Sequence, residues 1–166
     1  MTKGALYRHF ESKRAIFDSI LRRMEQQDAK EAQDHDLPEG TVETDAAAYE
    51  AVSVADIVAF SKAMFRYWTE DPFAAPFRRT LTLEQYQSPE MASLYQQYLA
   101  AGPMGYVADL FRSLGIPDPE RRAAVFYGPM FLLYSVWDGA EDKEAVTALL
   151  DEYMDEAKRE LEGERK

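Results

Sequence analysis

Residues 3–13 combine the side-chain types with which proteins contact DNA. Small residues at the start of a helix let the backbone approach base edges, and hydroxyl, imidazole and cationic groups beside them bind phosphates. The candidate contacts are Lys3, Gly4, Ala5, Tyr7, Arg8, His9 and Lys13. The alternative is a packed aromatic turn, because Leu6 and Phe10 are four residues apart and belong to one buried helical face.

The charge of the chain is unevenly distributed. The formal net charge is −11, yet six Lys and Arg against two acids give residues 1–23 a charge of +4 and leave −15 for residues 24–166. An acidic body is repelled by phosphates, so a DNA complex would have to form at the basic N-terminal end. A merely solvated basic helix explains the same charges.

The N-terminal motif resembles the tetracycline-repressor-like (TetR) family of transcriptional regulators. The residues that carry the resemblance are Gly4, Leu6, Tyr7, His9, Phe10, Ser12, Lys13 and Phe17. The resemblance implies that residues 1–12 are part of a helix-turn-helix head and that residues 13–33 link this head to a ligand domain. It also implies that Tyr7 and His9 touch phosphates, that Lys13 adds a charged contact, and that Lys3 and Ala5 face bases.

The family has two further helices before the recognition helix, whereas this chain has Met1 where the pattern usually has a Val. Because a GTG Val codon can also be read as a start, we hypothesise a start assigned too late or a truncation. Without those helices Leu6 and Phe10 would lose apolar cover, at a cost of ~1.5–3 kcal/mol each. We therefore expect specific DNA binding to be impaired in the chain as it stands, compared with the intact parent protein.

Apolar residues recur at three and four residues along most of the chain, and no segment has the sustained alternation typical of a strand. The sequence therefore predicts an all-α fold. Residues 34–52 contain Pro38, Gly40 and many acids with little periodicity, so we expect an acidic loop there. Residues 53–166 are expected to form a helical ligand-binding and dimerisation domain.

Aromatic and Met side chains on the apolar faces of the central helices are candidates for a ligand pocket. They are Phe60, Met64, Trp68, Phe77, Tyr95, Tyr98, Tyr106, Phe126, Met130 and Tyr134. Gly102-Pro103 and Gly128-Pro129 would splay helices and open space between them. Such walls suit an aromatic or lipophilic effector, with Arg66, Arg78 or Arg79 available for an acidic group. The alternative is an ordinary packed core.

The segment 119–138 is apolar on nearly every side, which predicts that it is buried all round. Together with the final helix it could form a four-helix interface about a two-fold axis, and we expect a homodimer. The expected interface residues are Phe131, Tyr127, Leu149, Tyr153, Met154 and Ala157. The alternative is a monomer in which this helix lies at the centre of the fold.

The sequence offers little for catalysis. It has two His and no Cys, with no Gly-rich phosphate loop and no His pair at metal-binding spacing, so we expect no enzyme activity, cofactor or metal. No apolar run approaches the ~20 residues that span a bilayer, and no signal peptide is recognisable. We therefore expect a cytoplasmic protein that does not enter membranes.

The resulting expectation is a ligand-responsive transcriptional regulator of the TetR type, a repressor. Two recognition helices about one turn of DNA apart, ~34–36 Å, would read a pseudo-palindromic operator. A ligand in the helical domain would shift the linking helix and release the DNA. The alternative is an all-helical ligand- or partner-binding domain that does not bind DNA.

Overall fold

The computed structural model describes residues 13–35, 37–38 and 44–164. All regular structure in these residues is helical, which confirms the all-α fold class. The helices are α2 (Lys13–Asp34), α3 (Ala46–Ala51), α4 (Val54–Glu70), α5 (Ala74–Glu84), α6 (Pro89–Leu99), α7 (Ala101–Ser113), α8 (Pro119–Gly139) and α9 (Lys143–Glu164).

Local capping defines where the central helices begin. Ser53 and Asp56 form a reciprocal capping box at the start of α4, in which the Asp56 N–H donates to Ser53 Oγ at 3.2 Å and the Ser53 N–H donates to Asp56 Oδ2 at 2.9 Å. At the start of α6, Ser88 Oγ accepts from the Met91 N–H and Pro89 takes the first helical position, as its sequence predicts. These caps satisfy N–H groups that the helices themselves leave unpaired.

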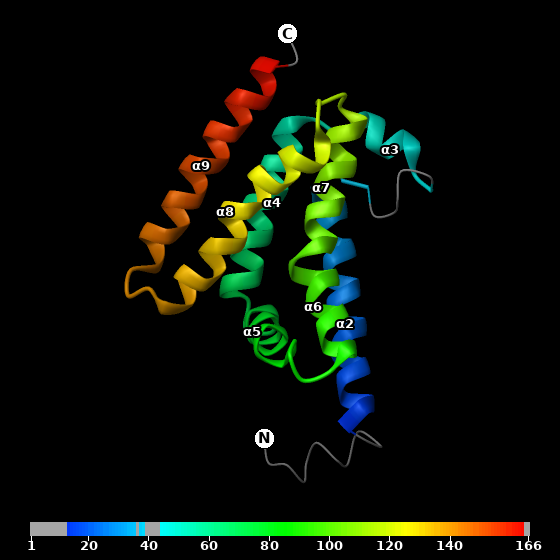
Figure 1. Cartoon of the computed structure of the whole chain (residues 1–166), viewed down its shortest axis with the longest axis vertical. Coiled ribbons are helices and arrows are strands. Elements are labelled where there is room, and N and C mark those ends of the chain that lie inside the picture. The colour runs from blue at the N-terminus through cyan, green and yellow to red at the C-terminus, as the bar shows by residue number, and fades with distance from the viewer. Residues whose placement is uncertain (1–12, 36, 39–43, 165–166) are drawn as a thin grey trace.

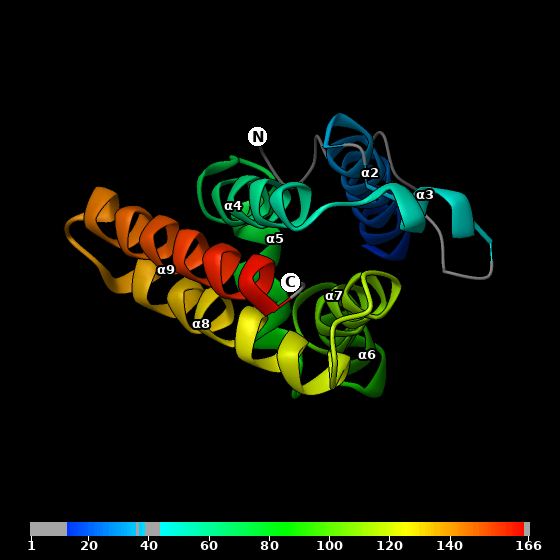
Figure 2. The same cartoon turned by 90° about the horizontal axis from the view of Figure 1, so that it is seen from above.

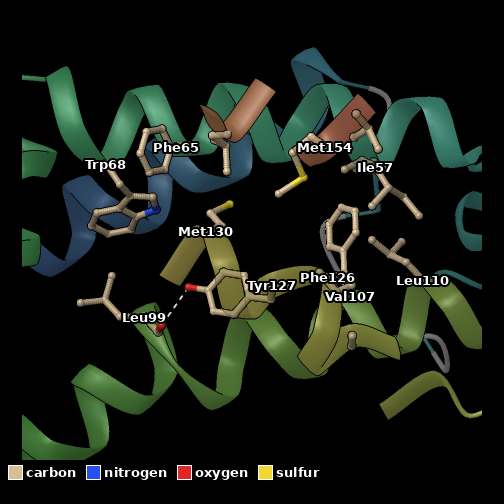
Figure 3. Close-up of a cluster of buried hydrophobic side chains, with 14 of the residues drawn as sticks. Ile57, Phe65, Trp68, Leu99, Val107, Leu110, Phe126, Tyr127, Met130 and Met154 are labelled. Carbon is tan, nitrogen blue, oxygen red and sulfur yellow. Dashed lines mark hydrogen bonds between the residues drawn. The ribbon is translucent and has the colours of Figure 1, made fainter. Parts of the chain in front are cut away.

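Helix α4 is the centre of the molecule and contacts α2, α5, α8 and α9 (Figure 1). Helices α8 and α9 form an antiparallel pair on one side of α4, and α2 lies on the other side (Figure 2). Helices α6 and α7 complete the body opposite α4. A cluster of buried side chains fills the space between α4, α7, α8 and α9, including Phe65 of α4, Met130 of α8 and Met154 of α9 (Figure 3).

The expected loop at 34–52 is partly wrong. It contains the short helix α3, whose Ala-rich sequence favours helix and whose Tyr49 is 1% exposed. The Tyr49 ring packs edge-on against Tyr106 of α7 with centroids 6.4 Å apart, and Leu37 is buried too. The many acidic residues of this segment gave no sign of these two buried side chains, which pack the described part of the segment against the body.

The interruption at Gly102-Pro103, which the sequence predicts would splay helices, separates two helices. Pro103 lacks an N–H and would clash with the carbonyl four residues earlier in a continuous helix, but it fits the first turn of a new one. Accordingly α6 ends at Leu99, Ala100 leaves helical geometry (φ −126°, ψ −94°), and α7 starts at Ala101. Gly128-Pro129, in contrast, lies inside α8, which continues through it.

Helix α7 ends as its sequence predicts. Gly115 adopts a left-handed conformation (φ 72°), and the Ile116 N–H then donates to the Phe111 carbonyl at 3.0 Å. Helix ends of this kind strongly favour glycine, because a residue with a β-carbon is strained in the left-handed conformation.

Candidate ligand cavity

A cavity of about 670 Å³ lies between α2, α4, α6, α7 and α8. Its volume falls within the ~300–1,000 Å³ typical of sites for small organic ligands. Three of the lining residues, Glu25, Gln97 and Gly102, are themselves exposed to solvent. The cavity therefore opens to solvent between α2 and the α6–α7 junction.

Seven of the ten side chains expected in a pocket line this one cavity. They are Phe60, Met64, Trp68, Tyr98, Tyr106, Met130 and Tyr134. They come from α4, α6, α7 and α8, so the fold gathers residues that are up to 74 positions apart in the sequence. That a ligand occupies the space stays a prediction.

The other three expected pocket residues do not line the cavity. Phe77 packs behind its wall, with ring centroids 6.3 Å from Trp68 and 5.7 Å from Tyr98. Phe126 is buried against Phe111, and Tyr95 is half-buried in α6. An apolar stripe on a helix identifies residues that face the interior, but it does not distinguish a cavity wall from the layer behind it.

Sequence reasoning missed the wall that α2 contributes. Glu25, Ala29 and Ala32 line the cavity from this helix. Their spacing of four and three residues places them on one face, and the two alanines in the otherwise polar second half of the helix were the available signal. It also missed Tyr127 as a lining residue, although Tyr127 precedes Met130 by three residues and Tyr134 by seven.

Three hydroxyl groups in the wall donate to backbone carbonyls. Tyr127 donates to the Leu99 carbonyl at 2.8 Å (Figure 3), Tyr106 donates to the Pro38 carbonyl at 2.8 Å, and Ser61 donates to the Ile57 carbonyl at 2.8 Å. Leu99 is the last residue of α6, so Tyr127 satisfies one of the carbonyls that a helix end leaves free. Burial, together with a neighbouring Tyr in each case, raises the pKa of Tyr106 and Tyr127, so both are neutral phenols.

The three arginines proposed for an acidic ligand are placed elsewhere. Arg78 is 3% exposed, donates to Asp138 at 2.6 and 3.0 Å, and donates through Nε to the Trp68 carbonyl at 2.9 Å. Arg66 pairs with Asp151 at 2.5 Å, and Arg79 lies on the surface, 4.0 Å from Asp138. None of the three lines the cavity. Arg78 instead stabilises the cavity from behind, because Trp68 and Tyr134, over whose ring it lies, are both wall residues.

The expected dimer interface is partly corrected by burial within one chain. Tyr127 and Met154 are 7% and 0% exposed, because Tyr127 faces the cavity and Met154 faces α4 and α8. Neither can therefore reach a partner. Phe131 and Leu149 are 39% and 54% exposed, whereas Tyr153 and Ala157 are half-buried.

The expectation that segment 119–138 is buried on all sides is wrong for the single chain. Val125, Leu132 and Val136 of α8 are 59%, 63% and 43% exposed. Their spacing of seven and four residues places them on one face of the helix. These three side chains form an exposed apolar surface, here called the α8 face, on the helix for which the sequence predicted a dimer contact; Phe131 and Leu149 are also exposed.

Of the expected DNA contacts, Lys3, Gly4, Ala5, Tyr7, Arg8 and His9 lie outside the described residues. Lys13 is the first residue of α2. The N-terminal turns of α2 extend beyond α5 and α6 at one end of the molecule (Figure 1).

Within the part of the chain that the structure describes, no three His, Asp or Glu side chains come together as a metal site. Nor is any helix in the described ranges both long and apolar enough to cross a membrane. Comparison with protein-family models, with curated proteins and with solved structures found no match to this chain.

Proposed function

We propose that this protein is a ligand-responsive DNA-binding regulator of the TetR type, acting as a repressor in the cytoplasm. The observation that carries the proposal is that α2, the helix that follows the DNA-binding motif, forms one wall of the cavity. A molecule in the cavity would contact the helix that directly follows residues 1–12 in the chain. Ligand binding and DNA binding would then be coupled through one rigid element.

The contacts of α2 with the body suit this role. Met24 is fully buried, Tyr67 donates to its sulfur at 3.7 Å, and Arg23 lies 3.9 Å above the ring of Phe73. These contacts lie near the middle of the helix, whereas Ala29 and Ala32 face the cavity with small side chains. A ligand that fills the space beside the two alanines would press on α2 and tilt it about its anchored middle.

Pairing of two chains through the α8 face would supply the second recognition helix. An exposed apolar surface of this kind is typical of a protein-protein contact, and a two-fold axis would bury it against its own copy. The two α2 helices would then present their N-terminal ends to one pseudo-palindromic DNA site. A ligand that binds one spacing of these ends better than another would shift the equilibrium and release DNA.

The test is selection from a pool of random-sequence duplex DNA, using the protein as its native host produces it. We expect enrichment of an inverted repeat whose half-sites are about one helical turn apart, ~34–36 Å. Replacement of both Tyr7 and His9 by Ala should abolish the enrichment, and Glu162→Ala, on the exposed surface of α9, is the control. A recovered pool in which no sequence motif is enriched would contradict the proposal.

A second candidate function is ligand binding without DNA. The observation that favours it is the charge of −15 on residues 24–166, which repels phosphates. In that case the same selection enriches no sequence while small-molecule binding in the cavity persists.

A further inference from the structure

The cavity has an unusual balance of charge. Among the described lining residues, tyrosines aside, Glu25 is the single ionisable side chain, and there is no Lys, Arg or His. Glu25 is exposed and stands at the opening on α2, so its carboxylate meets a ligand where the ligand enters. A ligand anion would find no cation in this wall, and burying an unpaired charge is costly.

Aromatic rings make up much of the wall, and the donors beside them are neutral: the Gln97 amide, the Trp68 indole and hydroxyl groups. Rings of Phe60, Trp68, Tyr98, Tyr106 and Tyr134 line the space. The hydroxyl groups of Tyr106, Tyr127 and Ser61 already donate to backbone carbonyls. The face of an aromatic ring carries negative charge density and attracts organic cations, most strongly where water is excluded.

Three basic side chains contact residues near the cavity but do not line it: Arg78, Arg23, and His35, whose ring packs edge-on against Phe60 at 5.9 Å. Arg78 lies behind Tyr134, with its guanidinium carbon 5.1 Å from the ring centroid, and both of its terminal nitrogens are paired with Asp138. Arg23 stacks on Phe73, which is not a lining residue. The described surroundings therefore favour a positive ligand over a negative one.

Building on the ligand-sensing function above, we propose that the cavity binds lipophilic organic cations. The aromatic rings would hold the apolar part of the molecule. The Glu25 carboxylate at the opening would attract its positive charge and orient it. The proposal keeps the lipophilic effector expected from the sequence, and none of the three arginines named there for an acidic group lines the cavity.

Two probes of the same shape and opposite charge test the proposal: tetraphenylphosphonium, a cation, and tetraphenylborate, an anion, in sodium buffer. Binding to the full chain is measured by calorimetry and by fluorescence of the Trp137→Phe variant, in which Trp68 of the cavity wall is the remaining Trp. We expect the phosphonium ion to bind about tenfold more tightly than the borate, and neutral triphenylphosphine oxide to bind more weakly than the phosphonium ion.

Glu25→Gln should weaken phosphonium binding about three- to tenfold. The difference in affinity between the phosphonium and the borate ion should become smaller. Glu31→Gln is the matched control, because it removes the same charge from α2 at a residue that pairs with Gln27 at 2.9 Å and does not line the cavity. We expect Glu31→Gln to keep the affinity of the unmodified chain. Circular dichroism checks that both variants are folded.

Borate or neutral probe binding as tightly as the phosphonium ion would overturn the proposal, as would equal effects of the two Glu variants or no binding of the phosphonium ion. These outcomes are separable from failure of the proposed function, because no DNA is present. Selection of an operator combined with no preference for cations would overturn only the ligand class. Cation binding without operator selection would overturn only the regulator.

Discussion

Most side chains that line the cavity are apolar or aromatic, yet polar atoms decide how the cavity is built. Tyr127 shows this most clearly, since its ring lines the cavity while its hydroxyl donates to the carbonyl of Leu99. One residue thus stabilises the end of α6 and supplies an aromatic face. Its assignment from sequence to a dimer interface was wrong because an apolar helix gives no sign of which side meets the rest of the chain.

The buried tyrosines make stability depend on pH in the alkaline range. Burial raises the folded-state pKa of Tyr106 and Tyr127 above the ordinary value of ~10, so the unfolded chain loses these protons first. Folding free energy from the neutral phenols is therefore complete below pH ~10 and declines as pH rises above it. We expect urea unfolding to show this decline above pH ~10 and not below it.

Tyr127→Phe should reduce the slope of this decline in the free energy of unfolding with pH. At neutral pH it should destabilise the fold by about 1 kcal/mol, because the Leu99 carbonyl loses its donor. Tyr86→Phe, at a ring that is 86% exposed, is the control and should keep the slope of the unmodified chain. An unchanged slope in Tyr127→Phe would contradict the role assigned to this burial.

At the scale of the helices, several ends depend on local chemistry that can be read from residue types. Ser53, Ser88 and Gly115 act at helix ends as their types predict. The helix expected over 13–33 is observed at Lys13–Asp34. The sequence could not predict that Ala29 and Ala32 of this helix complete the cavity, because that depends on how α2 packs against α4.

The close approach at the α6–α7 junction requires glycine. A β-carbon at Gly102 would lie 1.9 Å from the Gln97 carbonyl oxygen, a backbone atom that cannot move without shifting α6. We therefore expect Gly102→Ala to destabilise the fold by about 1–3 kcal/mol, as overpacking does. Because Gly102 lines the cavity, the substitution should also weaken ligand binding.

The matched control is Gly105→Ala, one turn further along α7. No atom lies within 4 Å of a β-carbon there, so alanine should stabilise the helix by about 0.5–1 kcal/mol relative to glycine. Urea unfolding of both variants measures the difference. Equal stability of the two would contradict the steric argument.

At the scale of the whole molecule, the α8 face predicts that two chains associate. We expect a dimer in sedimentation equilibrium at micromolar concentration. Leu132→Glu, at a position 63% exposed, should weaken the dimer about a hundredfold, because it places a charge in an apolar contact. Leu83→Glu, 72% exposed on α5, adds the same charge away from this face and should leave the dimer intact. A monomeric unmodified chain would contradict the pairing.

The central claim is that filling the cavity moves α2 relative to the body. The chain has no Cys, so spin labels can be placed on Gln26→Cys of α2 and Arg159→Cys of α9, both exposed positions. Ala59→Cys with Arg159→Cys is the control pair within the body. Labelled chains are diluted with unlabelled ones. The distance between the two spin labels is then measured by pulsed electron paramagnetic resonance with and without tetraphenylphosphonium. The Ala29→Phe variant places a larger side chain in the cavity and so tests the effect of filling it without a ligand.

We predict that phosphonium binding and Ala29→Phe each change the α2–α9 distance by about 2 Å or more, while the control pair keeps its distance. An α2–α9 distance that stays the same with the cavity filled would contradict the coupling on which the proposed function rests.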